Sequence, residues 1–386
     1  MRILVTASCS EGLVLPLVPI SWALRSAGHE VLVTAPANMA GVITDAGLAF
    51  AECHPPVEMP EVLSYDRAGH PVPMPRGEEN LLPHIGRGYA RLAVRLLDGV
   101  RTLAERWRPD LIVTETYGFV GPLVAAGLSV PWIEQGMRLS SPPSITRAGV
   151  EELRPELRAS GRTDLPPAML ALDLCPAGLR PQDRPGSLRM RFVPYNGRME
   201  NLPDWVLEKR ERPRVCLTFG TRVPLNRSPI RGGFSLLEEL MRRLPEIGAE
   251  VVVGASDAVV RDLGALPAGV RAAGHLPMGQ ILPSCDLIVH HGGVGTTLSA
   301  LTAGVPQVAV PVIAEVWESA RLLAAAGAAR QVPFAEASAD SVVQAAATVL
   351  KDPSYAERAE QLRAEIAELP SPAEAVRTIE RLVAAG

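Results

Sequence analysis

The stretch from Asp286 to Gly304, DLIVHHGGVGTTLSALTAG, places an apolar run, a cluster of glycines and a helical pattern in direct succession. The apolar run predicts a buried strand, the glycines predict a tight turn, and the last ten residues predict a helix that ends at Gly304. The first turn of a helix offers backbone N–H groups and partial positive charge, which together bind phosphate. We therefore expect a phosphate-binding turn whose backbone is exposed at Gly292, Gly293 and Gly295.

Two histidines and two threonines accompany these glycines. The hydroxyls of Thr296 and Thr297 can donate to phosphate oxygens, and so can a ring nitrogen of a histidine at the end of the strand. Because successive side chains on a strand point to opposite faces, we expect one histidine of the pair to meet the ligand, and we favour His290 over His291. The alternative interpretation is a glycine-rich turn with no ligand.

Several classes of protein are disfavoured by the sequence. It has no G-x-G-x-x-G after its first apolar run and no G-x-x-x-x-G-K-[ST], which disfavours a dehydrogenase and a P-loop ATPase. The net charge of −4 disfavours nucleic acid as a partner. Five scattered cysteines without C-x-x-C spacing fit a reduced compartment. Without a signal peptide or a long apolar stretch, we expect a soluble, cytoplasmic protein with no membrane contact.

The pattern of strand, turn and helix recurs along both halves of the chain. Apolar runs without polar alternation predict strands that are buried on both faces, as in a parallel sheet covered by helices. In the first half, such runs begin at Arg2, Glu30, Leu48, Asp110 and Val130. In the second half, they begin at Arg214, Ala249, Val270, Asp286 and Pro306. Each half is therefore predicted to be a doubly wound α/β domain.

Other segments interrupt or end this pattern. A chain of 386 residues is long for a single core, and the polar, proline-containing segment 193–214 is the expected linker between two domains. Residues 55–80 contain six prolines and lack a period, so we expect a long surface excursion that binds or covers something. Residues 372–385 have the apolar spacing of an amphipathic helix.

These motifs together resemble the family 1 glycosyltransferases of the GT-B fold, in particular the actinomycete enzymes that attach deoxysugars to polyketides. The resemblance is carried by PLVPISWALRSAGHEV near the start, by RPDLIVTETYGFVGPLVAAGLSVPW, and by the segment from Arg214 to Ala329 with its HHGGVGTT signature. The segment LRPELRASGRTDLPPAMLALDLCPAGLRP from Leu153 is similar to the subgroup that acts on angucycline-type aromatic polyketides.

The resemblance implies an α/β protein of two Rossmann-like domains that face a deep cleft. It implies an acceptor-binding domain over residues 1–200 and a nucleotide-sugar-binding domain over 201–370. Residues 371–386 would form a helix that crosses back to the first domain.

The resemblance also assigns candidate residues on the donor side. LTFGTRVP offers Gly220, Thr221 and Arg222 to the diphosphate or nucleoside, although Arg222 is equally well explained as a solvated loop residue. In GHLPMGQ, residues Leu276, Pro277 and Met278 would wall the base, with core packing as the alternative. Relatives carry an acidic residue and a glutamine for the sugar hydroxyls, and this chain has Glu315 and Val316. One polar contact is missing, which agrees with a deoxysugar donor.

The catalytic base is less clear in the sequence. Many relatives place a histidine in the first strand-to-helix loop, where SEGLVLPLVPI aligns Leu13 with it. We expect Glu11 to take the proton of the acceptor or to position the acceptor, and Ser10 to hydrogen-bond the diphosphate, although a loop glutamate is more often solvated than catalytic. The alternatives are Glu115, Glu134, or no base at all, because a phenol is already acidic. His29 is better explained as a residue that caps the end of a helix.

The acceptor is expected to lie against apolar and aromatic side chains of the first domain and the excursion. The candidates are Tyr65, Met74, Tyr117, Trp132 and Arg138, the last of which would polarise a carbonyl group. Each aromatic candidate has core or rim packing as its alternative.

The resemblance implies an inverting transferase that moves a deoxyhexose from a dTDP-sugar to an angucycline-like aglycone in antibiotic biosynthesis. The donor is a substrate, and neither a cofactor nor a metal is implied. O-transfer is favoured and C-transfer stays open, because the missing histidine resembles a departure found among C-glycosylating members. A non-catalytic nucleotide-binding partner of another transferase, a sugar-nucleotide epimerase and a homodimer are further alternatives.

Overall fold

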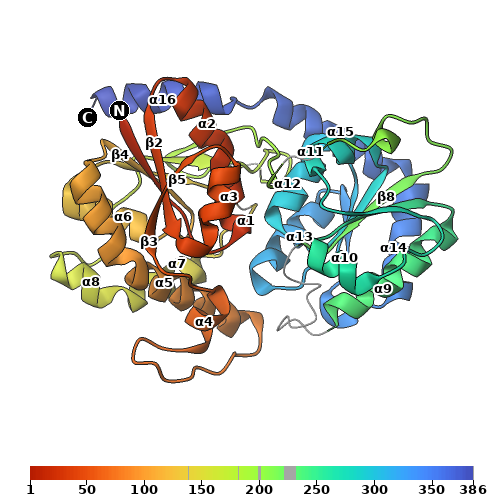
Figure 1. Ribbon diagram of the computed structural model, residues 1–386, viewed down its shortest axis with the longest axis horizontal. Coiled ribbons are helices and arrows are strands. Elements are labelled where there is room, and N and C mark those ends of the chain that lie inside the picture. The colour runs from red at the N-terminus through yellow and green to blue at the C-terminus, as the bar shows by residue number, and fades with distance from the viewer. Residues whose placement is uncertain (138, 181, 199–200, 221–231, 386) are drawn as a thin grey trace. The chain divides into compact units, whose positions relative to one another are not determined.

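The computed structural model describes residues 1–385 except for 138, 181, 199–200 and 221–231 (Figure 1). The chain divides into two compact units, and neither is a single continuous segment. Unit 1 comprises Met1–Cys175, Gln182–Arg191 and Leu369–Gly386. Unit 2 comprises Pro176–Pro181 and Phe192–Glu368.

Unit 1 is built on a seven-stranded, fully parallel sheet in the order β3-β2-β1-β4-β5-β6-β7. Its strands are β1 (Arg2–Thr6), β2 (Glu30–Pro36), β3 (Ala49–His54), β4 (Leu111–Glu115), β5 (Trp132–Gln135), β6 (Leu170–Asp173) and β7 (Ser187–Arg189). Its helices are α1 (Glu11–Val14), α2 (Val18–Ser26), α3 (Ala40–Asp45), α4 (Met59–Ser64), α5 (Glu78–Trp107), α6 (Val120–Leu128), α7 (Pro143–Glu152), α8 (Arg154–Ala159) and α16 (Pro372–Ala385).

Unit 2 contains a six-stranded parallel sheet in the order β10-β9-β8-β11-β12-β13. Its strands are β8 (Arg214–Thr218), β9 (Glu250–Gly254), β10 (Val270–Gly274), β11 (Leu287–His290), β12 (Gln307–Ala309) and β13 (Ala329–Gln331). Its helices are α9 (Gly233–Arg243), α10 (Asp257–Leu263), α11 (Met278–Ile281), α12 (Val294–Ala303), α13 (Trp317–Ala325), α14 (Ala339–Lys351) and α15 (Pro353–Glu368).

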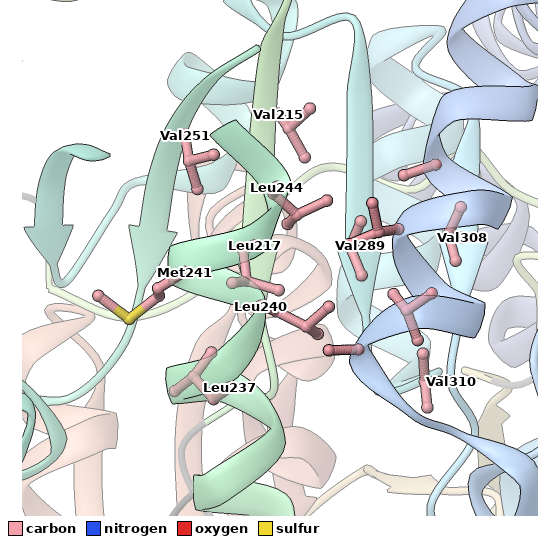
Figure 2. Close-up of a cluster of buried hydrophobic side chains, with 14 of the residues drawn as sticks. Val215, Leu217, Leu237, Leu240, Met241, Leu244, Val251, Val289, Val308 and Val310 are labelled. Carbon is pink, nitrogen blue, oxygen red and sulfur yellow. The ribbon is translucent and has the colours of Figure 1, made fainter. Parts of the chain in front are cut away.

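The central positions of the inner strands of unit 2 are apolar because helices cover both faces of the sheet. Alternate residues of β8 point to opposite sides: Val215 and Leu217 pack with α9 and α14, and Cys216 packs with α11 and α12. Figure 2 shows the first of these clusters, in which Leu237 and Leu240 lie over the strand residues. Burial on both faces is what removes the polar alternation from the sequence.

Both sheets reverse their strand order at one place, which is where ligands bind in open α/β sheets. In unit 1 the reversal lies between β1 and β4, and in unit 2 it lies between β8 and β11. Candidate residues therefore have to be judged by their distance from the carboxyl ends of these two pairs of strands.

The predicted doubly wound class is confirmed, and all ten expected strands are present. The sequence analysis missed β6, β7 and β13, which are short, and the 30-residue helix α5. β7 and β13 lie at the edges of their sheets, where partial exposure admits arginine and serine and hides the apolar run. Within the described ranges, no helix combines the length and the apolar composition needed to cross a membrane.

The excursion at 55–80 is more ordered than its composition predicts. It holds α4 and a turn in which the N–H groups of Ala68 and His70 both donate to Asp66 Oδ1, at 2.9 and 2.8 Å. Arg67 ties this turn to α8 through an ion pair with Glu156 at 2.9 Å. The segment is a structured part of unit 1.

The C-terminal helix α16 packs on α2 within unit 1 (Figure 1). Its apolar face buries Ala375, Val376 and Ile379 almost completely. His29 follows α2, and its Nε2 lies 3.1 Å from Glu380 Oε1 of α16. His29 thus contacts the C-terminal helix through its side chain in addition to following the end of α2.

Candidate functional site

The turn between β11 and α12 has the geometry of an anion cradle. Gly292 has a φ of +81°, which glycine adopts without strain, and Gly293 is the N-cap of the helix. The N–H of Thr297 donates to Gly293 O at 2.9 Å, so the N–H groups of the three preceding helical residues come before the first helical hydrogen bond. A Cβ built at Gly295 would meet nothing within 4 Å, which leaves space over the start of the helix.

The two histidines of this turn have different surroundings. His290 is 0% exposed, and its Nδ1 accepts a hydrogen bond from the N–H of Gly292 at 3.2 Å. His291 is partly exposed and lies over the glycines: a Cβ at Gly293 would be 2.4 Å from its Nε2, and a Cβ at Gly220 would be 2.8 Å from its Cε1. The preference for His290 over His291 as the residue facing the ligand is therefore corrected. The alternation argument holds, but the other member of the pair faces outward.

Both imidazoles are neutral near neutral pH. Burial lowers the pKa of His290 to about 3, with a further contribution from His291. Burial also lowers the pKa of His291 to about 4, and the backbone of Thr218 opposes this shift. A neutral His291 has one ring N–H, which it can donate to an oxygen of a bound anion.

The loop after β8 meets the turn after β11. Gly220 has a φ of +71°, and its N–H donates to Thr218 Oγ1 at 3.2 Å. Because β8 and β11 flank the reversal of strand order, Gly220 and His291 together mark the expected ligand crevice of unit 2. The predicted contacts Thr221 and Arg222 lie outside the described residues.

Residues 276–278, which are expected to receive the nucleotide base, are fixed by core packing and by two hydrogen bonds to Asn196. The side chains of Leu276 and Met278 are buried in the core cluster under the sheet, which is the packing alternative raised for Leu276. Asn196 binds this segment twice, because its Nδ2 donates to Leu276 O at 2.8 Å and its Oδ1 accepts from the N–H of Met278 at 3.0 Å. Asn196 was missed because nothing in the linker sequence marks it.

Glu315 lies in a short 3-10 turn, Ala314–Val316, after β12. The neighbouring Val316 contacts the anion cradle, since its Cγ2 would be 3.2 Å from a Cβ at Gly292. Trp317 fixes the loop by donating from Nε1 to Pro311 O at 3.2 Å. Glu315 is partly exposed at the same edge of the sheet as the glycine turn.

The first loop of unit 1 places Ser10 and Glu11 just after β1. Ser10 is the extended N-cap of α1, and its carbonyl accepts from the N–H groups of Leu13 and Val14 at 2.9 and 3.1 Å. Glu11 is exposed in the first turn of this helix. Leu13 is 6% exposed and contributes to the core.

The two alternative carboxylates have structural partners. Glu115 is buried, accepting from the Ser8 hydroxyl on Oε1 at 2.5 Å and from the N–H of Tyr117 on Oε2 at 2.7 Å. Glu134 forms a two-pronged ion pair with Arg184, with both N–O distances at 2.7 Å. These hydrogen bonds raise the pKa of Arg184. Of the three glutamates, Glu11 is the one that reaches solvent.

Four of the five residues expected to contact the acceptor fall into three groups. Tyr65 and Met74 are exposed on the excursion, at 43% and 58%. Tyr117 is 1% exposed and packs against Tyr89 with ring centroids 5.1 Å apart, so the structure places it in the core. Arg138 lies outside the described residues.

Trp132 requires a correction. It is the first residue of β5 and pairs with Ile112 near the start of β4. It therefore lies at the amino ends of the parallel strands, opposite to the edge that carries Ser10 and Glu11. A surface pocket of about 280 Å³ adjoins Trp132 there.

Comparison with known proteins agrees with this architecture. Residues 22–220 match the N-terminal domain, and residues 238–382 the C-terminal domain, of the erythromycin biosynthesis protein CIII-like family. The L-demethylnoviosyl transferase of Streptomyces niveus is 35% identical over 97% of this chain and 96% of its own length. The elloramycin glycosyltransferase ElmGT of Streptomyces olivaceus is 33% identical over 97% and 95%. The crystal structure of the Streptomyces sp. SF2575 glycosyltransferase SsfS6, complexed with thymidine diphosphate, is 55% identical, with a TM-score of 0.90 over 99% of both chains.

Proposed function

Because the chain belongs to the erythromycin biosynthesis protein CIII-like family of glycosyltransferases, we propose that it transfers a deoxyhexose from a dTDP-sugar to an aromatic, angucycline-like polyketide. The observation that carries the proposal is the meeting of the β11–α12 turn with Gly220 at the reversal point of the second sheet. The thymidine diphosphate bound by SsfS6, at 55% identity, supports the choice of nucleotide.

In this proposal, unit 2 holds the donor. The N–H groups at the start of α12 and the neutral ring of His291 stabilise the charge that grows on the departing diphosphate. The hydroxyls of Thr296 and Thr297 add donors at the same helix end, and the partly exposed Thr296 is the more accessible of the two. Glu315 binds a sugar hydroxyl. Val316 offers an apolar contact at the position where a deoxysugar has no hydroxyl group. No metal is required, because the helix end and these donors supply the positive potential.

Unit 1 binds the acceptor. Inversion needs the acceptor oxygen to lose its proton as it attacks the anomeric carbon from the face opposite the diphosphate. Glu11 is assigned as the base because the carboxylate of Glu115 already binds Ser8 and the Tyr117 N–H, and that of Glu134 is already paired with Arg184. Ser10, whose side chain makes no capping bond, positions the acceptor. Tyr65 and Met74 on the excursion offer exposed surface to a flat polycycle.

C-transfer on the same class of acceptor is the second candidate. The observation that favours it is the burial of Leu13, which leaves an apolar residue at the position where many relatives have a histidine base. Glu11 would help to deprotonate the phenol, and the ring carbon ortho to the phenolate would attack the anomeric carbon as the diphosphate leaves. That ring carbon would then lose its own proton, which restores the aromatic ring.

The test has two stages. First, millimolar dTDP should raise the melting temperature of the purified chain, because a ligand that binds the folded state stabilises it by mass action. An unchanged melting temperature would contradict the donor assignment. Second, incubation with a dTDP-deoxysugar and a polycyclic phenol should yield a product whose linkage NMR assigns to oxygen or to carbon. Transfer by the chain alone would also exclude a purely auxiliary role.

A further inference from the structure

Behind the anion cradle, two polar side chains lie on adjacent strands inside unit 2. His290 ends β11 and Gln307 begins β12, and both are 0% exposed. Gln307 pairs with Ile288, and alternate residues of a strand share a face, so His290 and Gln307 lie on the same face two positions apart. This pair is remote from solvent but adjoins both ends of the turn.

Each side chain holds one part of the cradle. The N–H of Gly292, at the start of the turn, donates to His290 Nδ1 at 3.2 Å. Gln307 Nε2 donates to the carbonyl of Thr297, in the first turn of α12, at 3.3 Å. An imidazole that accepts on Nδ1 and is neutral carries its proton on Nε2. The turn and the helix that supply the N–H donors are therefore both fixed from the interior.

The remaining polar atoms of the pair are complementary. Among the described residues, neither His290 Nε2 nor Gln307 Oε1 has a hydrogen-bond partner, and both are buried. One is a donor and the other an acceptor. The two side chains also lie close enough for a hydrogen bond between them to oppose the larger effect of burial, which lowers the pKa of His290. Buried polar groups of this kind are unfavourable unless they pair.

We propose that His290 and Gln307 are positioning residues, which share a hydrogen bond from His290 Nε2–H to Gln307 Oε1 and thereby hold the cradle in the geometry that a nucleoside diphosphate requires. The chain of bonds then runs from the Gly292 N–H through both side chains to the Thr297 carbonyl, and fixes the donors that face the anion. The inference rests on the proposed function, but concerns residues that do not touch the ligand. Preorganised backbone donors of this kind stabilise developing charge because they need no reorganisation.

The experiment compares dTDP with thymidine, which lacks phosphate, as calorimetric probes of the full chain. In His290→Leu and in Gln307→Met, dTDP affinity should fall about tenfold, the effect of losing one net hydrogen bond, while thymidine affinity stays unchanged. The double variant should bind dTDP about as tightly as either single variant, since both changes break the same chain of hydrogen bonds, from Gly292 to Thr297, which we call the relay. Gln344→Met, an exposed glutamine of α14, is the matched control.

A conservative variant and a spectroscopic readout complete the test. In His290→Asn, the amide oxygen can still accept from the Gly292 N–H, so its dTDP affinity should be partly restored relative to His290→Leu. In ¹⁵N-labelled protein, the Nε2–H resonance of His290 should lie downfield of its position in Gln307→Met, with or without dTDP. This signal reports the hydrogen bond between the two side chains directly.

The outcomes separate the inference from the proposed function. If wild type does not bind dTDP, the donor assignment fails and the relay fails with it. If wild type binds and the folded variants bind dTDP equally well, the relay alone is overturned. It is also overturned if dTDP and thymidine weaken to the same extent, because the pair would then merely support the fold. Should His290→Leu not fold, Gln307→Met and His290→Asn decide the question by the same criteria.

Discussion

At the carboxyl edge of unit 2, the groups at the reversal point are glycines, backbone N–H groups and a histidine that packs over them. At the equivalent edge of unit 1, between β1 and β4, the groups are side chains, and two of the buried ones, Ser8 and Glu115, are paired with each other. The same topology thus presents mostly backbone groups at the candidate site of one unit and mostly side chains at the candidate site of the other. A diphosphate is common to many donors, whereas acceptors differ, and this contrast fits the two roles that we propose.

The largest effect is expected from removing His291, the partly exposed histidine of the glycine turn in unit 2. In His291→Ala, kcat for sugar transfer should fall by about 10²–10³, the effect of losing one preorganised donor to a developing anion. Steady-state kinetics with a dTDP-sugar and a phenolic acceptor would measure this. His70→Ala, on the exposed excursion, is the matched control and should keep wild-type kcat. A wild-type kcat in folded His291→Ala would remove His291 from the donor site.

The side-chain site is tested at Glu11. Glu11→Gln should lower kcat about 10²-fold, since a general base contributes roughly this much, and should leave the KM for the donor unchanged. Glu105→Gln, an exposed change on α5, controls for the loss of one negative charge. If kcat is unchanged, Glu11 is not the base, and a phenol that reacts without a base becomes the better explanation.

The buried histidine of the backbone site should also be visible in acid stability. Unfolding restores the pKa of His290 from about 3 to an ordinary 6.5, so between these values the unfolded chain binds a proton that the folded chain excludes. The free energy of unfolding should then be unaffected by His290 above pH 6.5, and fall below it by up to ~1.4 kcal/mol per pH unit. Urea titrations from pH 7.5 to 5 would measure the slope, and His290→Asn should reduce it. Equal slopes in both proteins would mean that His290 is already accessible to protons when folded.

The smallest effect is expected at Trp132, on the opposite edge of the first sheet. Trp132→Phe should leave the KM for the acceptor within about twofold of wild type, because residue 132 lies at the amino ends of the strands. Tyr65→Ala, on the exposed excursion, should raise this KM. A raised KM in Trp132→Phe, with an unchanged KM in Tyr65→Ala, would show that the acceptor binds at the amino ends of the strands. This result would contradict our proposal.

The same contrast explains what the sequence could predict. The glycine turn and the central strands were recognisable because their residues are contiguous, and because burial on both faces leaves a continuous apolar run. The choice between His290 and His291 failed because alternation says that the two differ but not which one is inside. The partners of Glu115 and Glu134 could not be predicted, since Ser8 and Arg184 lie about 107 and 50 residues away and meet them only in the folded sheet. Asn196 was hidden for the same reason.

The return of α16 to unit 1 has a consequence for how this chain is made and engineered. Helix α16, with its buried Ala375, Val376 and Ile379, follows both sheets in the sequence, so during synthesis the surface of α2 that it covers stays open to water until both sheets have been made. Unit 1 is therefore finished after unit 2, although its first strand emerges first. A hybrid enzyme that exchanges the first half of this chain for that of a relative should exchange α16 with it, because α16 packs against α2 of that half.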